Sequence, residues 1–110
     1  MRLFGGKRPG RLRRGDSDDV RHLREFAATR PGVEAFVEPP TAVTTTTVVF
    51  VAGSGEWTRR RITDAVTAHS LANALGVPSY DAAVVGYPQR MRDWNARRKI
   101  EDQRDGAPEG

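Results

Sequence analysis

The chain has 110 residues, of which 37% are hydrophobic and 29% charged, a composition typical of one small soluble globular domain. It contains no cysteine, which excludes disulfides, thiolate catalysis and cysteine-ligated zinc. The formal net charge is +4, so an anionic partner is favoured over a cationic one. The two histidines, His22 and His69, lie on different segments and cannot form the usual close-spaced metal pair. We therefore expect neither a metal site nor a cofactor.

No apolar run approaches the ~18 residues that a membrane span needs. The first four residues also lack the apolar stretch of a signal peptide. We expect the protein to stay in the cytoplasm and to have no membrane partner.

The first part of the chain is strongly basic. Residues 1–15 contain six basic residues and no acidic residue, interrupted by glycines and a proline, with no periodic apolar face. This pattern predicts a disordered basic arm over residues 1–16. As a functional arm it would bind nucleic acid or an acidic protein surface through Arg8, Arg11, Arg13 and Arg14. As a structural feature it would simply be a solvated terminus.

The next residues predict a helix and two strands. The acidic stretch of residues 16–19 is typical of a helix start, and helical spacing of apolar residues predicts a helix over 18–29. Apolar and polar residues alternate over 33–38, which predicts a short strand. Residues 44–52 are rich in threonine and valine, and their run Val48-Val49-Phe50-Val51 indicates a central strand covered on both faces.

The segment after the Gly53-Ser54-Gly55 turn can be interpreted in two ways. Residues 56–62 are either a return strand or the start of a long helix, and the helix would complete a βαβ unit. We favour the strand, because Trp57, Thr58 and Ile62 suit a sheet and Thr63-Asp64 is a good helix cap. A second helix is then expected over 64–75, with Val66 among its inward residues and Gly76 at its end.

The rest of the chain is less regular. Residues 77–86 predict a fourth strand or a buried loop, residues 88–101 a third helix, and residues 103–110 a disordered tail. The fold class expected is α+β, in the order α-β-β-β-α-(β)-α. A mostly antiparallel sheet of three or four strands would be covered by helices in a single domain over residues 17–102.

The strongest functional feature is Trp57 followed by Arg59-Arg60-Arg61. Strand alternation would put Trp57, Arg59 and Arg61 on one face, where an aromatic ring and two guanidinium groups can contact bases and phosphates. The alternative is an edge strand whose charges prevent aggregation. With Arg97, Arg98 and Lys99 of the last helix, these residues predict a non-enzymatic protein that binds RNA or DNA.

Two other functions remain open. Met91 and Trp94 lie on the basic last helix and could anchor a partner protein, which would make the chain an adaptor. The turn Gly53-Ser54-Gly55-Glu56 follows a hydrophobic strand, as in a nucleotide-binding or oxidoreductase-like protein, but it lacks the lysine and the third glycine of the known motifs. Ser54, His69 and Asp81 have the residue types of a hydrolytic triad without its surrounding motif, so no catalytic residue is assigned.

The helix–strand–strand–strand–helix order over residues 18–75 is similar to the double-stranded-RNA-binding domain. The resemblance is topological, since Thr63-Asp64-Ala65 replaces that family's lysine-rich helix start and Pro39-Pro40-Thr41 its histidine-containing loop. It therefore implies no function here. The segments 51–61 and 80–88 also resemble short uncharacterised proteins of actinobacteria, which brings no reaction or ligand.

Overall fold

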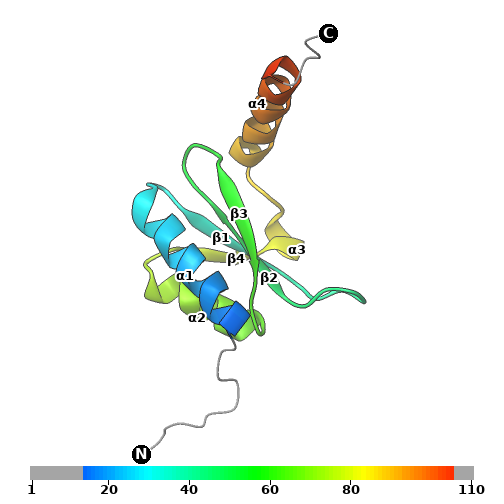
Figure 1. The fold of residues 1–110 in the computed structure, drawn as a ribbon. Coiled ribbons are helices and arrows are strands. Elements are labelled where there is room, and N and C mark those ends of the chain that lie inside the picture. Colours follow the sequence, from blue (N-terminus) through cyan, green and yellow to red (C-terminus); the bar gives the residue numbers. More distant parts are fainter. Residues whose placement is uncertain (1–13, 106–110) are drawn as a thin grey trace, which may run out of the picture.

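The computed structural model describes residues 14–105, with side chains over 17–104. The α+β class predicted from the sequence is confirmed (Figure 1). In chain order the elements are α1 (Arg14–Thr29), β1 (Glu34–Glu38), β2 (Thr47–Val51), β3 (Trp57–Arg61), α2 (Ala65–Ala74), β4 (Ser79–Asp81), α3 (Ala82–Val85) and α4 (Gln89–Asp105).

The four strands form one mixed sheet in the order β3-β2-β1-β4. β2 is antiparallel to both β1 and β3, whereas β4 runs parallel to β1. The expectation of a central covered strand is confirmed, because Val48, Val49, Phe50 and Val51 of β2 are all fully buried. The chain returns to β4 through α2, which is why this strand pair is parallel.

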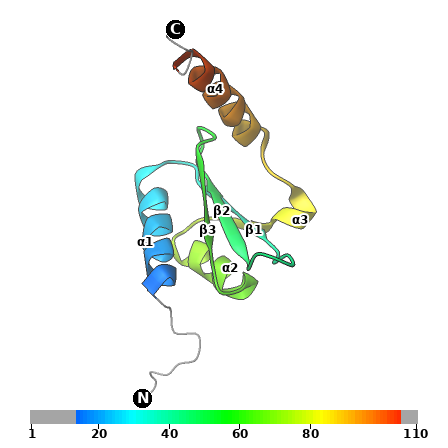
Figure 2. The ribbon, with the colours of Figure 1, turned by 45° about the vertical axis from the view of Figure 1, so that its right-hand side comes forward.

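The main core lies on the sheet face covered by α1 and α2 (Figure 2). Leu23 and Phe26 of α1 pack there against Phe50, whose ring meets that of Phe26 edge to face at 6.5 Å between centroids. Each such large side chain, when fully buried, contributes roughly 1.5–3 kcal/mol. α2 contributes Ala68 and Ala72, which are small enough for the helix to lie close to the sheet.

The opposite sheet face carries a smaller apolar cluster. Phe36, Val49 and Val51 of the sheet pack there with Ala82 of α3 and Met91 of α4. Only the first turns of α4 take part, and the rest of the helix extends away from the sheet in Figures 1 and 2. This second face is therefore partly open, and β3 lies along its border.

Several boundaries differ from those predicted. α1 begins at Arg14 instead of residue 18, so Asp18 and Asp19 lie inside the helix and not at its start. Residues 82–85 form α3 and no strand, because the Asp81 side chain accepts a hydrogen bond from the Ala83 amide and caps a helical turn. Val66, expected inward, is 76% exposed, since α2 packs through the narrow stripe of Ala68 and Ala72.

The two expected terminal segments are only partly described. The arm predicted over 1–16 overlaps α1, and its residues 1–13, with Arg8, Arg11 and Arg13, lie outside the described residues. The tail predicted over 103–110 is helical up to Asp105, because nothing before Gly106 interrupts the helix-favouring residues of α4. Residues 106–110 lie outside the described part.

Candidate nucleic-acid interface

β3 is an edge strand, since β2 is its single neighbour in the sheet. Its register places Trp57 opposite Val51, Arg59 opposite Val49 and Arg61 opposite Thr47. Side chains on a strand alternate between the two faces. Trp57, Arg59 and Arg61 therefore share the partly open face, as the sequence predicted, and Arg60 lies on the other face.

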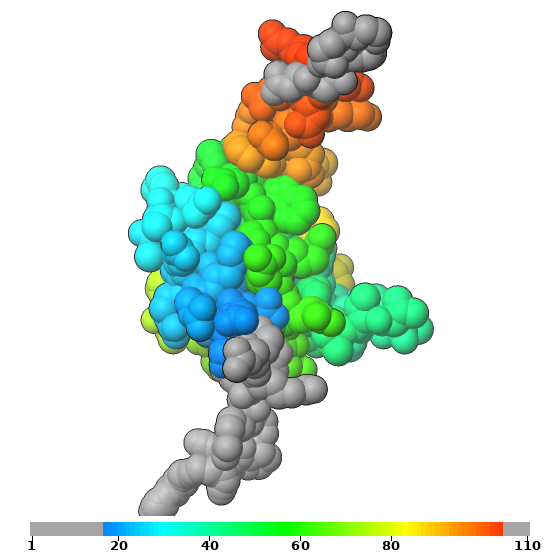
Figure 3. Space-filling view, viewed as in Figure 1, coloured from blue at the N-terminus to red at the C-terminus, as the bar shows by residue number. Residues whose placement is uncertain are grey.

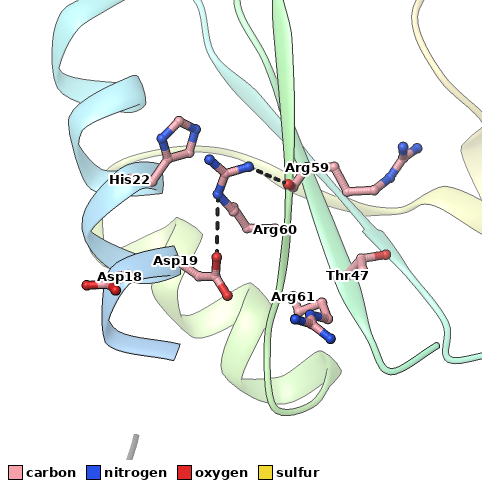
Figure 4. A pocket seen from close by; sticks show the side chains of 7 residues that line it. All are labelled: Asp18, Asp19, His22, Thr47, Arg59, Arg60 and Arg61. Carbon is pink, nitrogen blue, oxygen red and sulfur yellow. Dashed lines mark hydrogen bonds and ion pairs between the residues drawn. The ribbon is translucent and has the colours of Figure 1, made fainter. Parts of the chain in front are cut away.

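Arg60 is turned toward α1 (Figure 4). Its Nε lies 3.4 Å from Oδ1 of Asp19, and its Nη1 donates to the carbonyl oxygen of Arg59 at 3.0 Å. Beside it, His22 Nε2 and Thr58 Oγ1 are 2.7 Å apart. Burial, and then the nearby charge of Arg60, lower the pKa of His22, so this ring is held in its neutral form.

Arg59 is engaged by a carboxylate on β1. Its Nε donates to Oε1 of Glu38 at 2.8 Å and its Nη2 to Oε2 at 3.0 Å, which is the bidentate geometry that suits a guanidinium group. Its guanidinium carbon also lies 5.2 Å from the ring centroid of Trp57. The charge of Arg59 is therefore balanced within the fold.

Glu38 joins three parts of the molecule. Besides Arg59 of β3, it accepts hydrogen bonds from the hydroxyl groups of Thr47 on β2 and Tyr87 in the segment before α4. Burial alone would raise the pKa of Glu38, but the hydrogen bonds from Arg59, Thr47 and Tyr87 outweigh it and hold the pKa below its usual range. Burial, with the hydrogen bond to Glu38, raises the pKa of Tyr87, so this hydroxyl stays protonated as the donor.

The depressed pKa of Glu38 predicts an acid-sensitive fold. The stability that Glu38 contributes should be fully present above its ordinary value of 4.5 and lost as the pH falls through the folded-state pKa, because the unfolded chain binds the proton first. The measurement is the free energy of unfolding of the wild type and of Glu38→Gln between about pH 6 and pH 3. The gap between the two proteins should shrink on acidification, and a constant gap would contradict this role of the carboxylate.

α4 brings a second cationic cluster to the Trp57 end of β3. The Trp57 indole nitrogen donates to Oδ1 of Asn95 at 2.7 Å, and Arg97 Nη2 donates to the carbonyl oxygen of Ser54 at 3.2 Å. Arg98 pairs with Glu101 at 3.6 Å and lies 4.0 Å from Asp102, all on exposed helix surface. Trp57 is held between Asn95 and Arg59, so its ring is less free for base stacking than the sequence suggested.

The residues considered as adaptor anchors fix α4 to the fold. Met91 is only 6% exposed and packs in the second apolar cluster, which removes it from the surface available to a partner. Trp94 is half-buried, and its Cβ lies where a side chain at Gly55 would have to fit. Arg90 adds to the same contact, since it donates to the carbonyl oxygen of Ala52 at 2.8 Å and to Glu34 at 2.7 Å.

α1 begins at the other end of β3. Asp19 lies beside Arg60 and His22 beside Thr58, so α1 runs antiparallel to β3 and begins near the Arg61 end of the strand (Figure 1). Arg61 is exposed and forms no ion pair with any residue between 17 and 104. The exposed face of β3 thus lies between the start of α1, to which residues 1–13 are connected in sequence, and the α4 cluster.

The charge is distributed unevenly between the folded part of the chain and the residues that precede it. Residues 17–104 hold 12 basic and 11 acidic side chains, whereas residues 1–16 hold six basic side chains and one acidic one. Arg59, Arg60 and Arg98 each have a carboxylate partner, while Arg61, Arg97 and Lys99 have none among the described residues. Exposed ion pairs contribute about 0–1 kcal/mol, so Arg98, whose pair is exposed on both sides, can still exchange a carboxylate for a phosphate.

The nucleotide-binding interpretation of residues 53–56 depended on a helix after the turn, and the structure shows a strand there. Residues 57–61 form a paired strand, so no βαβ unit follows the turn. Groups of the turn are already bonded within the protein. The Gly53 amide donates to the Pro31 carbonyl oxygen at 2.9 Å, and the Glu56 carboxylate accepts two hydrogen bonds from Arg30, both at 2.9 Å. The hydrogen bond from Arg30 lowers the pKa of Glu56, which keeps this acid ionised and bound.

The residue types of a hydrolytic triad are not brought together. Ser54 lies in the β2–β3 turn, beyond the end of the ladder at which Val51 faces Glu34. Asp81 pairs with Val37, near the opposite end of β1. His69 Nδ1 instead lies 2.6 Å from Ser79 Oγ.

Within residues 14–105, no helix combines the length and apolar character needed to cross a bilayer. The same part of the chain contains no group of three or more histidine, aspartate or glutamate side chains that could hold a metal ion. No protein-family model, curated protein or solved structure matches the chain. Any functional assignment therefore depends on the geometry described above.

Proposed function

We propose that the protein binds RNA or DNA through the phosphate backbone, without reading base sequence. The observation that supports this proposal is the placement of the cations. α1, which follows the basic residues 1–13 in sequence, begins near one end of the exposed strand β3, and the α4 cluster lies at the other end. A nucleic-acid strand laid along β3 would meet cations without a described carboxylate partner at both ends of the strand, Arg61 at one and Arg97 with Lys99 at the other.

The basic side chains differ in whether they are free to contact phosphates. Arg8, Arg11, Arg13 and Arg14 supply the excess charge of the chain. Arg61, Arg97 and Lys99 have no carboxylate partner in the described residues and would contact phosphates directly. Each neutralised phosphate releases condensed counterions, and that release supplies most of the affinity of sequence-independent binding.

Charge-removing substitutions test this division. The triple variant Arg61→Gln, Arg97→Gln, Lys99→Gln should weaken binding to unrelated oligonucleotides by similar factors. It should also make the slope of log affinity against log salt shallower by about 3 on duplex DNA. Replacement of Arg8, Arg11, Arg13 and Arg14 by glutamine should have a similar effect. The measurement is fluorescence anisotropy of labelled RNA and DNA over a salt series.

Arg92→Gln is the matched control. Arg92→Gln also removes one positive charge from α4. The Arg92 side chain makes two hydrogen bonds, to Gln89 and to the carbonyl oxygen of Tyr87, whereas Arg97 makes one, to the carbonyl oxygen of Ser54. Its substitution should leave the salt slope nearly unchanged. If Arg92→Gln weakens binding as much per charge as the triple variant does, net charge and not placement governs affinity, and the proposed surface is wrong.

A further inference from the structure

The outer edge of β3 carries backbone groups that no described residue uses. Ile62 donates to Thr46 at 3.0 Å and Ala52 donates to Glu56 at 2.8 Å, which fixes the phase of the β2–β3 ladder. Narrow and wide pairs alternate in an antiparallel ladder. The amides and carbonyls of residues 58 and 60 therefore point toward β2, and those of Trp57, Arg59 and Arg61 point away from it.

These outward groups can receive another strand. Of their carbonyl oxygens, only that of Arg59 accepts a hydrogen bond within residues 14–105, and the donor is the movable Arg60 side chain. The space-filling view shows β3 reaching the surface between α1 and α4 (Figure 3). The other sheet edge, β4, is just three residues long and runs directly into α3, so it offers little to pair with.

A hollow of about 480 Å³ follows this edge (Figure 4). Asp18, Asp19 and His22 of α1, together with Arg60 of β3, line it on the helix side of the sheet. Arg59 and Arg61 lie on the other side, with Thr47. An incoming strand would thus place alternate side chains against two different surfaces. On one, Asp18 and Asp19 lie beside Arg60, and the other carries Arg59 and Arg61.

We propose that β3 accepts an extended peptide segment as a fifth strand, and that the segment carries glutamate or aspartate at alternate positions. Its acidic side chains would lie on the side of Arg61, which has no carboxylate partner among the described residues, and of Arg59, which Glu38 already pairs. Its intervening side chains would be uncharged because the helix side holds Asp18 and the ion pair of Asp19 with Arg60. Main-chain hydrogen bonds would supply affinity and the alternation would supply register, as in other cases of strand addition.

The same charges argue against a second copy of this chain as the occupant. Two β3 edges paired antiparallel would bring their arginines into neighbouring positions, and like charges across a strand pair are destabilising. Charged residues on an edge strand commonly prevent such self-pairing. An acidic strand is the occupant for which this edge is complementary.

The test uses the full chain and a fluorescein-labelled peptide of about eight residues in which glutamate alternates with threonine. Arg61→Ala removes the guanidinium group and keeps the backbone amide, whereas Arg61→Pro removes both. The amide of Arg61 points away from β2, so proline costs no ladder bond within the fold. Arg61→Pro should bind the peptide about fivefold to tenfold more weakly than Arg61→Ala.

Two further arms keep the experiment decisive. Two peptides are N-methylated at every second amide, one at the odd and one at the even positions. The wild-type protein should bind one of them more weakly and the other as well as the unmethylated peptide, because only alternate amides face β3. This comparison needs no protein variant. A peptide of the same composition with its glutamates grouped together should also bind more weakly. Equal binding by Arg61→Ala and Arg61→Pro together with indifference to N-methylation would overturn the proposal. If affinity for the peptide falls only with the number of charges removed, the edge binds polyanions such as nucleic acid and not a strand, which would also overturn the proposal.

Discussion

Replacing Gly55 by alanine should lower the free energy of unfolding by about 3 kcal/mol and release α4 from the sheet. Gly55 has a φ of +97°, a backbone conformation that residues with a side chain rarely adopt. A Cβ at this position would collide with the carbonyl oxygen of Arg90 and lie 2.8 Å from its carbonyl carbon. The colliding atoms belong to the backbone of α4, so they cannot move without moving the helix.

The experiment compares Gly55→Ala with Gly76→Ala. Gly76 has a similar φ of +74°, but a Cβ added there would lie in open space. Gly76→Ala should therefore lose only the free energy of backbone strain, about 1 kcal/mol. Urea unfolding gives the two stabilities, and amide hydrogen exchange of α4 reports its release. Equal losses in the two variants, with exchange in α4 unchanged, would contradict the close docking of α4 on the turn. Because α4 carries Arg97 and Lys99, its release should also weaken binding to nucleic acid.

Replacing Glu38 by alanine should cost about 2 kcal/mol of stability. The carboxylate accepts hydrogen bonds from Arg59, Thr47 and Tyr87, and its side chain is 16% exposed. Removing it leaves a half-buried guanidinium group and two hydroxyl groups without their acceptor. The Arg59 side chain is 42% exposed and can partly rehydrate, which keeps the cost below that of a fully buried pair.

Glu56→Ala is the control for this substitution. Glu56 also holds an arginine by two hydrogen bonds, but both side chains of that pair are about one third exposed. Surface pairs of this kind contribute less than about 1 kcal/mol. Chemical denaturation followed by tryptophan fluorescence distinguishes the two variants. A loss in Glu38→Ala no larger than in Glu56→Ala would show that the junction of β1, β2, β3 and Tyr87 is not cooperative.

The elements that the sequence predicted well have strong local patterns. The valine-rich stretch that became β2 has no polar position to expose, and its central place in the sheet follows from that. The choice between strand and helix for β3 was decided by β-branched and aromatic residues, followed by the Asp64 cap of α2. In each case the signal is contained within a few neighbouring residues.

The parts that could not be predicted depend on residues far apart in the chain. Glu38 is 21 residues from Arg59 and 49 from Tyr87, and Arg90 is 56 from Glu34. Nothing in the local pattern of an alternating strand marks its last glutamate as the acceptor of four hydrogen bonds. The sequence predicts a binding role for the arginine run, but it cannot show that Arg59 and Arg60 are paired with carboxylates on opposite faces of the sheet.

These pairings change the proposed function in one respect. The body of the protein supplies a few available cations in defined places, and the excess charge comes from the N-terminal arm. We therefore expect the arm to provide much of the affinity for phosphates, and the folded body to align the nucleic acid along β3. An acidic peptide strand at the β3 edge would compete for Arg61, which links the two proposed interactions.

The salt dependence of nucleic-acid affinity tests the central claim most directly. The full chain is titrated against a labelled duplex DNA between about 50 and 200 mM salt. If about six phosphates are neutralised along the arm, β3 and α4, log affinity should fall against log salt with a slope near −5. A slope near zero, or no binding at the lowest salt, would contradict the account.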